Sequence, residues 1–115
     1  MAHNILKIPF ADIYEMYIQK VERKSQPREG LITIITWLSG YTEDALQKHL
    51  AEKTSMEDFF NNFPKLNENA GLITGSICGY KVEEITDPFM QRIRYMDKLV
   101  DELAKGKSLE KILRK

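Results

Sequence analysis

The chain has 115 residues, of which 43% are hydrophobic and 30% charged, so we expect one folded domain over 1–115 whose core needs no disulfide or metal. Its 17 basic and 17 acidic residues balance, which argues against nucleic acid or an anionic membrane as a partner. The longest uncharged run, 30–42, is shorter than the roughly 20 residues of a membrane span. With a single cysteine and no expected leader peptide, the sequence favours a cytoplasmic protein.

The residues up to Gly40 predict two helices. Asp12 and Glu15 have the spacing of a capping box, and apolar residues follow at helical spacing as far as Val21. Pro27 suits the first turn of a second helix, and Gly40 suits its left-handed C-terminal cap. This second helix is apolar on nearly all sides, so we expect it at the centre of the fold.

A buried strand is the alternative for part of the second helix. Ile32–Thr36 contains five consecutive β-branched residues, a run that is also typical of strands. The glycine cap and the helical pattern on both sides favour the helix. Two shorter helices follow, capped by Thr42 and Ser55, and the second of them ends at Pro64.

A similar uncharged phrase occurs twice, at 30–41 and 71–80, and ends each time in Gly-Tyr. The match continues further, with an acidic residue four positions after Gly40 and Gly79 and an aliphatic residue six positions after each. We interpret the two places as similar helix-helix corners. In each, a buried helix would end at a glycine with positive φ, and the tyrosine would fold back onto the last turn.

The clearest helix of the chain begins with Asp87 as its cap and Pro88 in its first turn. Apolar residues at steps of four and three form a packing seam along it: Phe89, Ile93, Met96, Val100 and Leu103. Two pairs of opposite charge stand at i,i+4 beside the seam: Lys98 with Glu102 and Asp101 with Lys105. Gly106 would end this helix, and Ser108 would start a last short one.

Taken together, these elements predict an all-α fold, a bundle of five or six helices with two similar Gly-Tyr corners. We expect the helix that starts at Asp87 to pack across the one that contains Trp37. In this interpretation Gly71, Gly75 and Gly79 line up on one helix for close packing. The alternative is an α+β fold, in which Ile32–Thr36 and Leu72–Val82 are strands.

The last eleven residues hold the chain's concentrated positive charge, with five basic residues against Glu110. The basic side chains would point away from the apolar side of the last helix: Lys107, Lys111, Arg114 and Lys115. We interpret them as a solvated face whose positive charge stabilises the C-terminus of a helix through the helix dipole. The alternative is an electrostatic contact with an acidic protein or nucleic acid.

Three stretches of the sequence carry a family resemblance. They are WLSGYT at Trp37–Thr42, the pattern FF…P…LN from Phe59 to Asn67, and the whole run LITGSICGYKVEEITDPFMQRIRYMDKLVDELAKGKSLEKILRK from Leu72 onward. With these stretches the chain resembles the bacterial family known as domain of unknown function 2200, over nearly its whole length. The resemblance implies a small cytoplasmic prokaryotic protein with no assigned activity, so no catalytic or binding residue follows from it.

The residues most often used in catalysis form no recognisable motif. Cys78 lies beside a predicted helix C-terminus, where the dipole disfavours a thiolate, so we interpret it as a small buried hydrophobe. His3 and His49 have no cysteine or histidine partner at metal-ligand spacing, and the chain has no phosphate-binding loop. We therefore predict no catalytic residue, no metal and no cofactor.

One polar cluster remains as a candidate site: Glu83, Glu84, Asp87, Arg92, Arg94 and Tyr95. Arginine beside carboxylates and an aromatic ring suits a ligand or protein contact, and equally a salt-bridged corner between helices. The favoured function is a non-enzymatic protein-interaction or oligomerising module. The alternatives are a helix-turn-helix regulator using Trp37–Lys53, and a small enzyme or ligand-binding protein using this cluster. Carboxylates at Glu43 and Asp44, where DNA phosphates would lie, argue against the regulator.

Overall fold

The computed structural model describes residues 5–77 and 79–114. Within these ranges the chain forms six α-helices, three short 3₁₀ helices and one two-stranded antiparallel hairpin. The α-helices are α1 (Phe10–Arg23), α2 (Glu29–Ser39), α3 (Glu43–Glu52), α4 (Met56–Asn61), α5 (Pro88–Ala104) and α6 (Leu109–Ile112). The hairpin pairs β1 (Ser76–Ile77) with β2 (Tyr80–Lys81), and the 3₁₀ helices are η1 (Ile5–Lys7), η2 (Ala70–Leu72) and η3 (Val82–Glu84). The fold is mainly α, as the sequence predicts.

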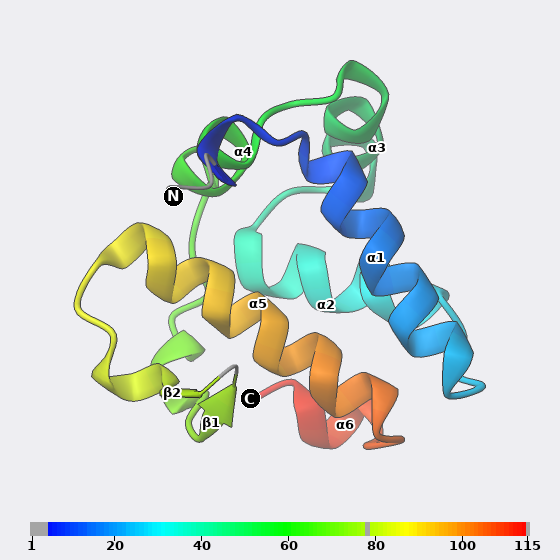
Figure 1. Ribbon diagram of the computed structural model, residues 1–115, viewed down its shortest axis with the longest axis vertical. Helices are drawn as coiled ribbons and strands as arrows, with labels where there is room; N and C mark the ends of the chain where they lie inside the picture. The colour runs from blue at the N-terminus through cyan, green and yellow to red at the C-terminus, as the bar shows by residue number, and fades with distance from the viewer. Residues whose placement is uncertain (1–4, 78, 115) are drawn as a thin grey trace.

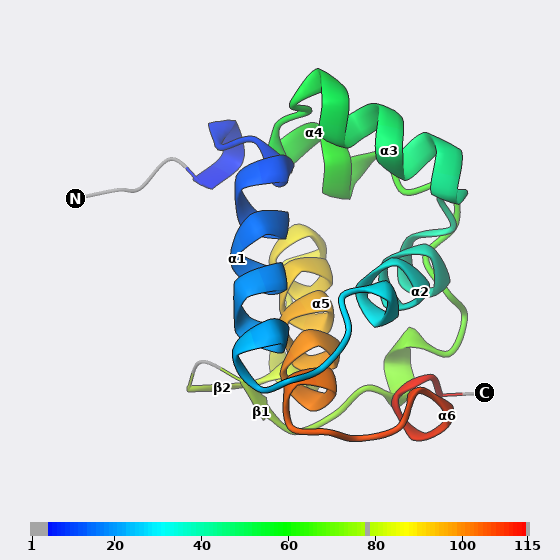
Figure 2. The same ribbon diagram turned by 90° about the vertical axis from the view of Figure 1, so that its right-hand side faces the viewer.

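Helix α5 is the centre of the fold. It contacts α1, α2, α4, α6 and β1, and Figure 2 shows it between α1 and α2. In Figure 1 the hairpin and α6 lie along its lower side. Four of the five residues of the predicted seam face this core: Ile93, Met96, Val100 and Leu103 are at most 4% exposed. The fifth, Phe89, is partly buried against it. The prediction that this helix packs across the one containing Trp37 is confirmed.

The β-branched run in α2 is helical, so the strand alternative is wrong there. Leu31, Ile34, Ile35 and Leu38 are all fully buried, and they cover several sides of the helix because it lies between α5 and the rest of the core. The helix ends as predicted, with Gly40 at φ +81° in the left-handed conformation and its N–H donating to the carbonyl of Thr36.

The predicted caps are confirmed at three of four helix starts. Thr42, Ser55 and Asp87 each accept a hydrogen bond from a backbone N–H in the first turn of the helix that follows. The predicted capping box of α1 is wrong, because this helix begins two residues before Asp12, at Phe10. Tertiary contacts fix that earlier start: Phe10 is fully buried, stacks on the ring of Phe59, and donates its N–H to the carbonyl of Thr54 at 2.8 Å.

The second uncharged phrase is not a helix, so the two Gly-Tyr places are not equivalent corners. Gly79 has φ +84°, as predicted, but it lies between the two strands of the hairpin instead of ending a helix. Gly75 also has positive φ, and two such residues four apart interrupt a helix. The strand alternative for Leu72–Val82 is right only at β1 and β2. The predicted alignment of Gly71, Gly75 and Gly79 on a helix is therefore wrong.

The tyrosines differ in the same way. Tyr41 is buried, at 5% exposed, but its ring packs against His49, Phe59 and Phe63 and not on the last turn of α2 as predicted. Its hydroxyl donates to the carbonyl of Phe59 at 2.7 Å. Tyr80 is 57% exposed. Side chains of α3 and α4 cover the ring of Tyr41, whereas the ring of Tyr80 in β2 lies at the surface against the guanidinium of Arg94.

The C-terminal segment packs against α5 more closely than the sequence indicates. Gly106 ends α5 at φ +91° and Ser108 precedes α6, as predicted. Arg114, however, is not part of a solvated face: its guanidinium binds both carboxylate oxygens of Glu102 at 2.7 and 2.8 Å, and Glu102 is only 6% exposed. The predicted pair of Lys98 with Glu102 is therefore wrong, while the pair of Asp101 with Lys105 is present at 3.0 Å.

Candidate functional site

Two open hollows lie next to each other where α1, the hairpin and α5 meet. The first has a volume of about 690 Å³ and lies between the hairpin, the connection that follows it and the first turns of α5. The second has a volume of about 540 Å³, and its lining comes mostly from α1 and α5, with Ile77 from the hairpin. Arg94 lines both, so its side chain marks the boundary between them.

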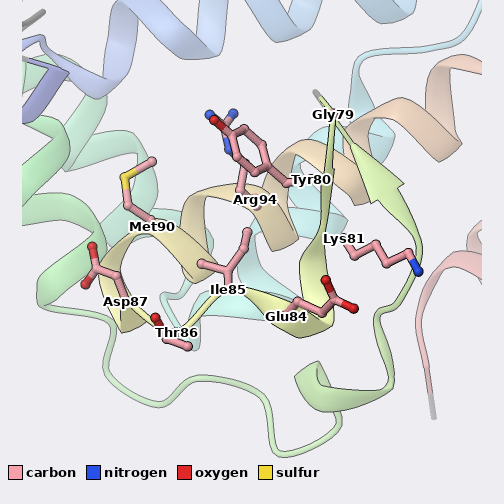
Figure 3. Close-up of a pocket in the computed structure, with 9 residues that line it drawn as sticks. All are labelled: Gly79, Tyr80, Lys81, Glu84, Ile85, Thr86, Asp87, Met90 and Arg94. Atoms are coloured by element: carbon pink, nitrogen blue, oxygen red, sulfur yellow. The ribbon is translucent and has the colours of Figure 1, made fainter.

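The first hollow combines an aromatic ring, aliphatic groups and charges of both signs. Figure 3 shows the Tyr80 ring against the Arg94 guanidinium, with Met90 and Asp87 across the hollow from them. The guanidinium carbon lies 5.6 Å from the centre of the ring, a distance that allows a cation–π interaction. Asp87 also caps α5, so one of its oxygens is turned toward the backbone N–H of Phe89.

The second hollow has apolar walls and a basic rim. Its apolar residues come from four elements that are distant in the sequence: Ile13 and Met16 of α1, Met56 of α4, Ile77 of β1, and Ile93 and Val100 of α5. Three basic residues at the C-terminal end of α1 also line it: Lys20 and Arg23 in the helix, and Lys24 directly after it. An apolar depression with a rim of one charge sign suits an amphipathic protein segment of the opposite charge.

A short hydrogen-bonded chain holds Arg94 between the two hollows. The hydroxyl of Tyr17 donates to one oxygen of Asp97 at 2.7 Å, and Arg94 donates to the other oxygen at 2.9 Å. The side chains of Arg94 and Asp97 are both less than a quarter exposed. Because Asp97 is held by α1 and Arg94 by Asp97, the guanidinium is kept in place under the exposed ring of Tyr80.

The structure brings together only part of the polar cluster predicted from the sequence. Glu84, Asp87 and Arg94 line the first hollow. Arg92 lies elsewhere, with its guanidinium over the ring of Phe63 and a hydrogen bond to the carbonyl of Phe60.

The remaining two members of the predicted cluster, Glu83 and Tyr95, stabilise local structure. Tyr95 is 6% exposed, and burial raises the pKa of its hydroxyl. Glu83 accepts the N–H of Gly75 at 3.0 Å, and hydrogen bonds from its own backbone N–H and that of Gly75 lower its pKa. The cluster is therefore divided between a surface hollow and structural contacts.

Met16, Tyr17, Tyr80 and Asp97 line or support this site and were missed in the sequence. Tyr17 belongs to the apolar stripe of α1, which predicts a core position, and it is 7% exposed. The Gly-Tyr pattern predicts that Tyr80 folds onto a helix. Met16 does offer a signal in the sequence, since it is a large apolar residue outside that stripe. The structure leaves it 61% exposed. Its position beside α5 depends on the packing of two helices about 80 residues apart in sequence, as the Tyr17–Asp97 bond shows.

The histidine described by the structure has structural contacts. His49 Nδ1 is 2.8 Å from the hydroxyl of Thr54, and its ring packs against Tyr41. Cys78 and His3 lie outside the described residues, so the prediction that Cys78 is buried stays a prediction. In the part of the chain that the structure describes, no group of three or more histidine, cysteine or acidic residues could hold a metal ion. Over the same ranges, no helix has the length and apolar character needed to cross a membrane.

Comparison with known proteins agrees with the resemblance noted in the sequence. The model of a family described as "Uncharacterized protein conserved in bacteria (DUF2200)" matches residues 4–114. No curated protein matches the chain. Among solved structures, the chain is similar to one titled "Crystal structure of uncharacterized protein SP1917". The two share 41% sequence identity with a TM-score of 0.92, over 98% of this chain and 93% of that chain. The chain belongs to the bacterial DUF2200 family.

Proposed function

We propose that this protein is a non-enzymatic protein-binding module. Its contact face consists of the exposed side of α1, the hairpin strands β1 and β2, the connection 82–87 and the adjoining side of α5. The observation that carries the proposal is the position of two large apolar side chains. Met16 and Tyr80 are 61% and 57% exposed, and each lines a hollow that Arg94 also lines.

The residue types on the contact face support a protein partner. Tyrosine, methionine and arginine are enriched at the buried centres of protein–protein interfaces, and tyrosine and arginine dominate binding energy there. Arg94 is held by Asp97 before any partner arrives. Such preorganisation lowers the conformational entropy that binding must otherwise overcome.

The alternative functions have less support. An enzyme or ligand-binding protein built on the predicted cluster would need Arg92 and Tyr95 in the same hollow as Glu84, and they contribute to other contacts. A helix-turn-helix regulator would present α3 to DNA, and this helix begins with the exposed carboxylates Glu43 and Asp44. Negative charge at that point would oppose contact with phosphates.

We also propose that residues 1–115 act as one domain in the cytoplasm. Contacts of α5 with α1, α2, α4 and α6 tie both halves of the chain to one core, which supports the single domain. The lone cysteine of the sequence supports a reducing compartment.

A photo-crosslinking experiment tests the contact face directly. Tyr80 is replaced by p-benzoylphenylalanine in cells of the source bacterium, and a second strain carries the same group at Leu72 as a matched control. Leu72 is 58% exposed and lines neither of the two hollows. Irradiation should join position 80, but not position 72, to a specific protein that mass spectrometry identifies.

Binding to that protein is then measured with purified components. Tyr80→Ala and Met16→Ala should each weaken binding about tenfold or more, as expected for side chains at the centre of an interface. Leu72→Ala should leave binding unchanged. Equal crosslinking at positions 72 and 80, or equal affinity of all three variants, would contradict the proposal.

A further inference from the structure

We infer that the partner of the contact face is a second copy of this chain, paired with the first about a two-fold axis. The inference rests on the proposed function and adds to it the identity of the partner. In this pairing the acidic connection 82–87 of each copy lies on the basic rim formed by α1 of the other copy, and the Tyr80 rings meet near the axis.

The charges on the contact face are divided between its two ends. Arg94 and Asp97 bind each other at the middle. Apart from that pair, the charged residues that line the first hollow are the acidic Glu84 and Asp87 and the basic Lys81. Figure 3 shows Asp87 and Lys81 on opposite sides of it. The second hollow is lined by three basic residues, Lys20, Arg23 and Lys24.

The two charged ends are separated along α5. Asp87 caps the first turn of this helix, whereas Lys20 binds Asp101 near its last turn at 3.2 Å. Fourteen residues of α-helix between positions 87 and 101 correspond to about 21 Å. The contact face is therefore acidic at one end, basic at the other, and apolar and aromatic between them.

A face with this charge distribution is complementary to itself after rotation by half a turn. A two-fold interface brings residue i of one copy against residue j of the other, and j against i, so every favourable charge contact occurs twice. The acidic, partly apolar segment that would suit the second hollow is present on the chain itself, in the connection that contains Glu84, Ile85 and Asp87. No other partner is needed to supply it.

Two properties of the whole chain favour the same pairing. Its 17 basic and 17 acidic residues cancel, so two copies approach without net repulsion. Its dimensions of 31 × 30 × 29 Å make one side large enough for a specific interface, which needs about 800 Å² from each partner.

Sedimentation equilibrium of the purified full chain tests the pairing with a charge swap. Wild-type protein should sediment at twice the monomer mass of 13.4 kDa, and the dimer should weaken at about 0.5 M salt, which screens exposed charges. Arg23→Glu and Glu84→Lys each place like charges together at two points of the dimer, so each alone should weaken self-association about tenfold or more.

Mixing the two variants should restore association, because a heterodimer of Arg23→Glu with Glu84→Lys has opposite charges at both points. Lys48→Glu is the matched control: it makes the same charge change on α3, which contributes no residue to either hollow, and should leave the dimer intact. Circular dichroism confirms that every variant is folded.

A wild-type chain that stays monomeric up to about 1 mM would overturn the inference. So would a dimer that responds to Arg23→Glu no more than to Lys48→Glu, or a mixture that does not re-associate. These failures are separate from failure of the proposed function. A monomeric chain whose position 80 crosslinks specifically to a different protein keeps the contact face and loses only the second copy as its partner.

Discussion

Replacing Gly40 with alanine should destabilise the protein far more than the same replacement at Gly79. Both glycines have nearly the same left-handed conformation, with φ of +81° and +84°. A Cβ atom added at Gly79 would meet nothing within 4 Å, whereas one added at Gly40 would lie 2.8 Å from both the backbone N and the backbone O of Lys65. Backbone at this distance must move as a unit, because it has no side-chain rotation that could relieve the contact.

The expected magnitudes follow from these surroundings. An alanine in the left-handed conformation costs about 1 kcal/mol at either position, after allowance for the lower entropy of the unfolded chain. At Gly40 the loop of Lys65 must also move away from the end of α2, where it donates three hydrogen bonds. They run from Lys65 N to Ser39 O, from Asn67 N to Leu38 O and from Asn67 Nδ2 to Trp37 O. Loss of these bonds brings the expected cost for Gly40→Ala to about 3 kcal/mol or more.

Urea denaturation followed by circular dichroism measures both variants. Gly79→Ala should lower the free energy of unfolding by about 1 kcal/mol, and Gly40→Ala by about 3 kcal/mol. Equal losses within about 0.5 kcal/mol would refute the reasoning, because the contact with Lys65 would then add nothing to the conformational strain.

Three further predictions concern groups that are at least partly buried. Arg114→Ala leaves the carboxylate of Glu102 without its bidentate partner, so it should lower the free energy of unfolding, measured by urea denaturation, by about 3 kcal/mol. Adding Glu102→Gln to the same chain should recover part of this loss. Burial alone would raise the pKa of Asp101, but Lys105 and Lys20 hold it below 3.8. The resulting stability is complete above that value and is lost as pH falls through the folded-state pKa, so Asp101→Asn should flatten the acid side of a plot of unfolding free energy against pH. Burial raises the pKa of Tyr41 from 10.0 to about 12, so stability should fall as pH rises from about 10 to 12 in wild type and fall less in Tyr41→Phe.

The helices that local residues determine could be predicted from the sequence. The start of α5 is an example, since Asp87 and Pro88 supply the cap and the first turn within two positions. The corner at Gly40 is another, because a long apolar run precedes the glycine and a capping threonine follows it. At Gly79 the glycine correctly predicted positive φ, but φ alone does not distinguish the end of a helix from the tip of a hairpin.

The candidate site depends on contacts that no local pattern encodes. Residues close in the sequence suggested a cluster from Glu83 to Tyr95, yet helical geometry turns Arg92 away from Arg94. Met16 joins the site only because α1 packs along α5. The sequence pattern places Arg114 in the basic tail, because its partner, Glu102, is reached only after the chain turns at Gly106.

The most direct measurement of the central claim, that the contact face binds a second copy, is a dilution series of amide NMR spectra of the wild-type chain. As the protein is diluted, chemical shifts and line widths should change for the hairpin 76–81, the connection 82–87 and residues 20–24, and they should stay constant for α3. The account would be contradicted if chemical shifts and line widths in these three segments did not change on dilution, or if the changes were centred on α3.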